Sequence, residues 1–189
     1  IKGAYRMEFL SNLVNGISLG SVYAVIALGY TMVYGIARML NFAHGDIIMV
    51  GGYICFIVMT SLGLPSIVGI LAAVVVCTIL GITIERVAYK PLRSAPSLAV
   101  LITAIGVSYL LQNLALLIWG SDPKSFTSVV SMEPLRLFDG SLVITGETIV
   151  TIVVSAIIMA ALTLFVNRTK VGHAMLAVSE DKGAAQLMG

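Results

Sequence analysis

Five apolar stretches, each close to the length that a helix needs to cross a bilayer, run through this chain of 189 residues. A membrane-spanning helix takes about 20 residues at a rise of about 1.5 Å per residue. Hydrophobic residues make up 59% of the chain and charged residues 11%, whereas a soluble domain carries about 25% charged residues. The sequence therefore predicts an all-α integral membrane protein. Its transmembrane domain is expected over residues 9–166, with five helices at 9–36, 47–62, 66–84, 98–119 and 148–166.

Two terminal segments lie outside the predicted domain. Residues 1–8 are expected to form an N-terminal tail, and Ile1–Arg6 within it precede Met7, the more natural start. We interpret these six residues as either upstream sequence or a cloning remnant. Residues 167–189 form a second polar segment, which retains a helical pattern.

Lysine and arginine are divided unequally between the two sides that five spans define. One side carries seven, at Arg38, Arg86, Lys90, Arg93, Arg168, Lys170 and Lys182. The other carries four, at Lys2, Arg6, Lys124 and Arg136. Because cytoplasmic loops are enriched in Lys and Arg, we expect the N-terminus and the loop at 120–147 outside the cell. Residues 167–189 are then expected in the cytoplasm.

Composition and motifs argue against several classes of function. A net charge of +2 is too small to indicate nucleic-acid binding. Cys55 and Cys77 lie inside apolar runs, so we interpret them as small apolar fillers with neither a disulfide framework nor a metal site. No P-loop motif occurs, so this chain is expected to bind neither a nucleotide nor another cofactor.

Small residues recur at a spacing of four in the first span, at Gly16, Gly20 and Ala24. Such a stripe allows two helices to approach closely in lipid, where association depends on close contact. We expect these three residues to serve helix packing.

The joint between the first two spans contains Asn41, His44 and Asp46 and is unusually polar. In one interpretation it is a broken or re-entrant element whose backbone faces a water-filled path. In the other, which its chemistry favours, it is a cytoplasmic turn in which Asp46 caps the second helix and His44 is solvated. An intramembrane enzyme using His44 and Asp46 would need further catalytic groups, and the sequence supplies none at matching depth.

Two amides, Gln112 and Asn113, interrupt the fourth span. Buried amides need partners, so we expect them to face other helices or a cavity. A structural hydrogen bond between helices is favoured over a substrate contact.

The C-terminal segment suggests two short amphipathic helices, the second capped by Ser179 and opening with acidic residues. Such helices suit the groove of a partner protein. The alternative is a pair of helices lying on the membrane, which is less favoured because anionic lipid repels acidic residues.

Four ordered blocks and the C-terminal segment carry a resemblance to a known family. The blocks are Asn15–Ala24, Ala27–Ile36, Asn41–Asp46 and Glu85–Arg93. Together they resemble the membrane subunit of ABC importers for branched-chain amino acids, of the kind paired with a second, related permease. Members usually continue with further spans, so the resemblance implies that this sequence is the N-terminal part of a longer protein.

The resemblance also implies a mechanism and partners. Residues 167–189 look like the importer coupling loop, which docks into a cleft on a separate ATPase. The ATPase subunits would hydrolyse ATP, and an extracytoplasmic binding protein would deliver the amino acid to a permease in a bacterial or archaeal plasma membrane. The coupling residues implied in this way are Gly172, Glu180, Asp181, Ala185 and Gly189.

The candidates for a translocation path or gate are Asn41, His44, Asp46, Gln112 and Asn113. Two other functions stay open. Relatives of this family also carry urea or short amides, and a channel or secondary transporter would work without ATP. Ion coupling would require charged residues deep within the spans, and the sequence shows none there.

Overall fold

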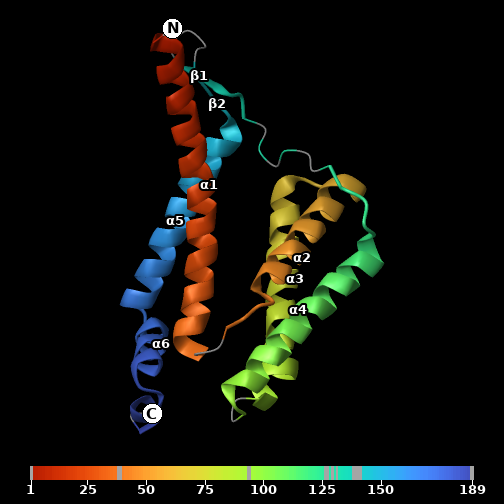
Figure 1. Cartoon of the computed structure of the whole chain (residues 1–189), viewed down its shortest axis with the longest axis vertical. Coiled ribbons are helices and arrows are strands. Elements are labelled where there is room, and N and C mark those ends of the chain that lie inside the picture. The colour runs from red at the N-terminus through yellow and green to blue at the C-terminus, as the bar shows by residue number, and fades with distance from the viewer. Residues whose placement is uncertain are drawn as a thin grey trace. The chain divides into compact units, whose positions relative to one another are not determined.

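The computed structural model describes residues 2–37, 40–92, 95–125, 128, 130, 132–137 and 142–187. The chain forms two compact units. Unit 1 combines residues 1–38 with residues 128–189, and unit 2 comprises residues 39–127. Figure 1 shows the helices and strands of each unit.

The predicted all-α fold with five membrane-length helices is confirmed, because five helices are long and apolar enough to cross a bilayer. They are α1 (Lys2–Ala37), α2 (His44–Phe56), α3 (Ser66–Ile84), α4 (Ser97–Trp119) and α5 (Gly146–Arg168). A π-helical turn, η1 (Ile57–Ser61), continues α2, and η2 (Glu85–Tyr89) with η3 (Lys90–Leu92) continues α3. Helix α1 begins at Lys2, so it includes residues that the sequence analysis assigned to an N-terminal tail.

The helix ends in unit 2 follow from local sequence. Gly63 adopts a φ of 63°, a left-handed conformation that glycine tolerates best, in the turn between η1 and α3. Pro65 and Pro96 precede the first residues of α3 and α4, where a missing N–H costs nothing. Gly120, with a φ of 79°, ends α4. Each of these residues acts on the backbone within one or two positions of the helix end.

Helices α2 and α3 pack closely through small residues (Figure 1). A Cβ atom added at Gly51 would lie 2.9 Å from the Cys77 Sγ, and one added at Gly69 would lie 3.2 Å from the Cys55 Sγ. The Cys77 thiol also donates a hydrogen bond to the carbonyl of Ile47, at 3.4 Å. Both cysteines are free, and they fill space between two helices.

The small-residue stripe predicted on α1 behaves differently. No atom of the described chain lies within 4 Å of a Cβ added at Gly16 or Gly20, and both residues are exposed. The stripe is therefore not used for packing among the described elements, and its role in helix packing stays a prediction. Close packing through glycine occurs instead at Gly51 and Gly69, which the sequence analysis had not selected.

Unit 1 is built on the pairing of α1 with α5. An antiparallel ribbon of β1 (Leu135–Leu137) and β2 (Leu142–Ile144) lies beside the N-terminal part of α1 (Figure 1). This ribbon was not predicted, because three-residue strands leave almost no periodic pattern in the sequence. After α5 the chain continues as α6 (Lys170–Glu180) and α7 (Lys182–Leu187), and α6 packs against both α5 and α1.

Candidate functional site

A polar network joins α2 to α4 inside unit 2. Asp46 is 7% exposed and accepts hydrogen bonds from the Ser108 hydroxyl, at 2.5 Å, and from the Gln112 amide, at 3.1 Å. The Gln112 amide also lies 3.2 Å from the Ser108 hydroxyl oxygen. The three side chains thus form a closed triangle between two apolar helices.

A ring stack holds the same two helices further along. The rings of Tyr53 and Trp119 are stacked with centroids 4.4 Å apart and planes 4° from parallel. Tyr53 follows Asp46 by two helical turns, and Trp119 follows Gln112 by two turns. Helices α2 and α4 therefore run in the same direction and are joined at two levels.

The network lies near the middle of α4, which runs from Ser97 to Trp119. Helix α2 with η1 has 18 residues, whereas α3 with its extension has 27. At about 1.5 Å per residue, α2 starts about 13 Å short of the far end of its antiparallel neighbour. In agreement, Ala43 at the start of α2 is fully buried against Ile84 and Leu111, and Ser108 is close to the midpoint of α4. The first turn of α2 is therefore level with the middle of α4 rather than with its first residue.

The other predicted path residues take separate positions. The Asn41 carboxamide oxygen accepts hydrogen bonds from the Ala43 N–H, at 3.1 Å, and from the Tyr89 hydroxyl of η2, at 2.9 Å. His44 is half-buried as the first residue of α2. Asn113 is exposed and donates to the Tyr109 carbonyl of its own helix, at 2.7 Å. The structure thus brings together Asp46 and Gln112, but not Asn113.

One sequence-based interpretation of this joint is wrong. Asp46 does not cap α2: the capping position is Ala43, without a side-chain cap, and the Asp46 carboxylate faces α4. The preferred interpretation, a hydrogen bond between helices, is correct for Gln112. It is wrong for Asn113, whose amide donates within its own helix. Ser108 was missed, although it precedes Gln112 by four residues and so shares its helix face.

A second candidate site is the elbow between α5 and α6. The Thr169 hydroxyl donates to the Phe165 carbonyl of α5, at 2.7 Å, and accepts from the Gly172 N–H of α6, at 2.9 Å. The His173 ring nitrogen Nδ1 lies 2.8 Å from the Thr169 carbonyl oxygen. One threonine therefore ends the last membrane-length helix and caps the next one.

Gly172, one of the predicted coupling residues, is buried at this elbow. A Cβ atom added there would overlap the backbone of Phe165 and Val166. Only glycine lets α6 fold back this closely on the end of α5. Its position explains a structural need, while its part in coupling stays a prediction.

The remaining predicted coupling residues follow this elbow. Glu180 is the exposed last residue of α6, and Ala185 is half-buried in α7. The Asp181 carboxylate accepts from the N–H groups of Gly183, at 2.8 Å, and Ala184, at 3.0 Å. Gly189 lies outside the described residues.

The predicted cap of the second short helix is wrong. Ser179 lies inside α6, where its hydroxyl donates to the Leu176 carbonyl. Asp181 holds the capping position because α6 extends two residues further than expected. The expectation of two short helices is correct.

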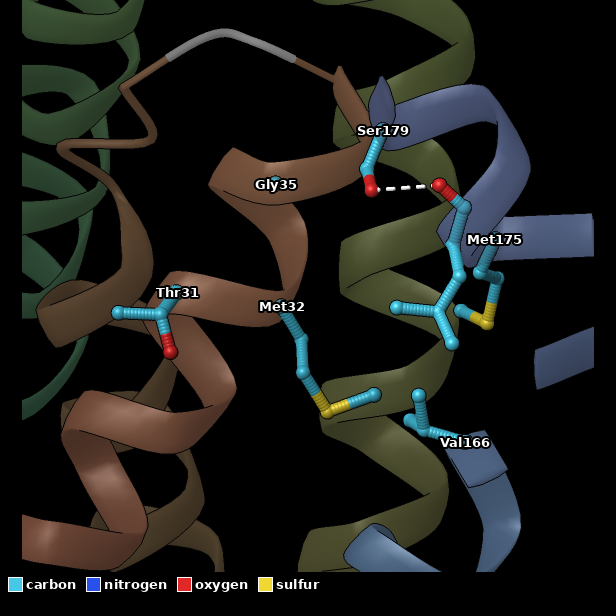
Figure 2. Close-up of a pocket in the computed structure, with 7 residues that line it drawn as sticks. Thr31, Met32, Gly35, Val166, Met175 and Ser179 are labelled. Carbon is cyan, nitrogen blue, oxygen red and sulfur yellow. Dashed lines mark hydrogen bonds between the residues drawn. The ribbon is translucent and has the colours of Figure 1, made fainter. Parts of the chain in front are cut away.

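A cavity of about 200 Å³ lies under α6, within unit 1. Figure 2 shows Met32 reaching from α1 toward Val166 of α5 and Met175 of α6. The wall of the cavity is mostly apolar, and Thr31 and Ser179 are its polar residues. Helix α6 packs on both α1 and α5, and the three helices line this cavity. Among the described residues, no group of His, Cys, Asp and Glu side chains could hold a metal ion.

The comparison with known families decides the class of this chain. A family model described as the permease component of the branched-chain amino acid transport system matches residues 12–189. The chain belongs to this permease family. It is accordingly a multi-pass membrane protein, as the five apolar helices also indicate.

Individual relatives agree with the family. The chain is 42% identical to the high-affinity branched-chain amino acid transport system permease protein BraD of Pseudomonas aeruginosa, over 96% of this chain and 62% of that protein. It is 40% identical to the permease protein LivH of Escherichia coli, over 97% of this chain and 63% of that protein. A more distant relative, a probable LivH of the archaeon Methanocaldococcus jannaschii, is 26% identical over 94% of this chain and 57% of its own.

The chain spans about three fifths of the length of the curated relatives it matches. No solved structure matches it. The family match and the individual relatives confirm, at the level of the family, the resemblance found in the sequence.

Proposed function

We propose that this chain forms the translocation path of an ABC importer for branched-chain amino acids. The observation that carries the proposal is the family match over residues 12–189, together with the substrate printed in the names of BraD and LivH. The permease would bind no nucleotide, and separate ATPase subunits would hydrolyse ATP. A second, related permease would complete the path, and membrane lipid would surround both.

The α5–α6–α7 segment supports the coupling role. A lever needs a stiff connection to the helices that it moves, and the Thr169 hydrogen bonds with the close packing at Gly172 provide one. Helix α6 also packs on α1, so a displacement of α6 would reach two membrane-length helices. Exposed acidic residues, Glu180 and Asp181, lie at the junction of α6 and α7, where an ATPase surface would meet them.

The orientation follows from charge. We infer that the side carrying Arg86, Arg168 and Lys170 faces the cytoplasm, by the positive-inside rule. The N-terminus and the loop at 120–147 then face outward, where a soluble binding protein would deliver the substrate. The membrane would be the plasma membrane of a bacterium or archaeon, since the relatives come from organisms of both kinds.

Reconstitution of the complete importer tests the proposal. The complete permease, its partner permease and the ATPase subunits are placed in proteoliposomes, and radiolabelled leucine uptake is measured with the binding protein. We expect uptake only with ATP, and none when the double variant Glu180→Lys with Gly189→Trp replaces the native protein. Leucine uptake without ATP would indicate a channel, and uptake of urea in place of leucine would reassign the substrate class.

A further inference from the structure

We propose that the Asp46 carboxylate receives the α-ammonium group of the amino acid on its way across the membrane, and that the Gln112 amide covers this site when it is empty. The inference rests on the proposed function, because it takes an amino acid as the substrate. It adds a specific binding group to a path that was predicted only as a set of polar residues.

The Asp46 carboxylate is buried among hydrogen-bond partners that do not balance its charge. Asp46 is 7% exposed, and its hydrogen-bond donors, Ser108 and Gln112, are both neutral. A buried carboxylate loses several kcal/mol of solvation free energy, which neutral donors offset only in part. Ionisable side chains inside a membrane accordingly pair with a cation or belong to a substrate pathway. An α-ammonium group is the cation that every amino acid supplies.

The Asp46 carboxylate can be reached from the exposed face of α4 by the movement of one side chain. Gln112 is exposed, whereas Ser108 is half-buried beneath it. The Gln112 amide donates to the Asp46 Oδ1 atom, at 3.1 Å, from the exposed side of α4. Rotation of this single side chain would free Oδ1 for an ammonium group and leave the Ser108 hydrogen bond to Oδ2 in place. An ammonium group carries three N–H donors, so it can replace the lost amide donor.

The surface of α4 around Gln112 suits the aliphatic side chain of the substrate. Tyr109 and Leu116 flank Gln112 on the same face of α4, and both are exposed, at 63% and 52%. An aliphatic side chain held near Asp46 would therefore meet apolar surface. Ammonium recognition with an apolar wall fits leucine, isoleucine and valine, and a negatively charged acid without an amino group would be repelled.

The substitution Asp46→Asn separates binding of a cation from support of the helix pair. Asparagine has the same shape, its Oδ1 atom can accept from Ser108, and its amide can donate to the Gln112 carbonyl after that amide flips. The link between α2 and α4 is therefore kept while the negative charge is lost. The matched control is Thr103→Val on α4, because within the described part of the chain the Thr103 hydroxyl bonds the Ala99 carbonyl of its own helix, at 2.9 Å.

The experiment uses the complete importer in proteoliposomes and two readouts. The first is ATP-dependent leucine uptake beside the thermal unfolding midpoint of each variant. The second is photolabelling with photo-leucine, a leucine analogue that carries a diazirine in its side chain, followed by peptide mapping. For Asp46→Asn we expect at least a tenfold loss of uptake and of label on the α4 peptide, at an unchanged unfolding midpoint. Excess leucine should prevent labelling of the native protein, and 4-methylpentanoate, which lacks the amino group, should not.

Each other outcome overturns the inference in a recognisable way. Uptake by Asp46→Asn within twofold of the native rate would show that no charge is needed there, and the importer function would stand. Loss of uptake together with a lower unfolding midpoint would show that Asp46 supports the fold or pairs with a cation elsewhere in the complex. Absence of leucine uptake by the native importer would remove the proposed function, and this inference with it.

Discussion

Gly69 of α3 packs directly on Cys55 of α2, and a Cβ atom added at Gly69 would lie 3.2 Å from the cysteine Sγ and 3.3 Å from the Met59 Cγ. A side chain at Gly69 would therefore force Cys55 or Met59 to shift. In lipid this closeness matters, because helices associate through van der Waals contact and hydrogen bonds rather than by escaping water. Close packing against α3 thus holds α2, the helix that carries Asp46.

Replacement of Gly69 by leucine should separate α2 from α3. Overpacking of this kind costs about 1–3 kcal/mol, so we expect a lower thermal unfolding midpoint in detergent. The matched control is Gly81→Ala in the same helix, because nothing lies within 4 Å of a Cβ at Gly81. Alanine there should hold or raise the midpoint, because glycine costs a helix about 0.5–1 kcal/mol relative to alanine. Equal midpoints for Gly69→Leu and the native protein would show that the contact adds no stability.

The helices could be predicted from the sequence because each apolar run is long and its ends carry their own signals. Pro65, Pro96 and Gly63 are examples, since each acts on the backbone within one or two residues. The ends of α5 and α6 were less predictable. Helix α6 runs through Ser179, whose hydroxyl bonds back to its own helix, and a serine looks the same in sequence whether it caps a helix or lies inside one.

The partners of the candidate site residues could not be predicted from local patterns. Asp46 and Gln112 are 66 positions apart, and only the packing of α2 beside α4 brings them together. The polarity of both residues was visible in the sequence, which is why each was selected. Ser108 was hidden because single serines are common in membrane helices and its importance depends on facing Asp46. The turn of Thr169 and Gly172 is local, yet its close approach appears only when the backbone of α6 is placed.

Replacement of Thr169 by valine should loosen the α5–α6 elbow. Valine keeps the shape but removes both hydroxyl hydrogen bonds, to the Phe165 carbonyl and from the Gly172 N–H. Loss of a cap costs about 1 kcal/mol, so we expect several-fold faster hydrogen exchange in the first turn of α6. In the complete importer, leucine uptake should fall further than ATP hydrolysis, because a loosely held α6 would pass less of the ATPase movement to the membrane-length helices.

The control for this elbow is Thr163→Val on α5. The Thr163 hydroxyl makes the same kind of bond, to the Met159 carbonyl at 2.8 Å, but caps nothing. We expect native exchange rates in α6 and native coupling for this variant. If the two valine variants behave alike, the Thr169 cap has no special role.

Replacement of Gly172 by alanine tests the close approach itself. The added methyl group would meet the backbone of Phe165 and Val166, which cannot rotate away as a side chain can. Helix α6 should therefore move away from the end of α5. Overpacking of this kind costs about 1–3 kcal/mol of folding free energy. The measurement is the distance between spin labels on exposed positions of α6 and α1, which should lengthen and broaden. Gly106→Ala, at an exposed position of α4 with nothing within 4 Å, should leave that distance unchanged.

Replacement of Asp181 distinguishes its capping role from its charge. The Asp181 carboxylate accepts from the N–H groups of Gly183 and Ala184 at the start of α7. Asparagine is a comparably good cap, whereas alanine costs about 1 kcal/mol. If capping is what coupling requires, Asp181→Asn should import leucine at the native rate and Asp181→Ala several-fold more slowly. If the ATPase instead recognises the negative charge, both variants should lose uptake equally while Glu180→Gln loses it in part. Uptake assays of the three variants, with membrane insertion verified for each, decide between these roles.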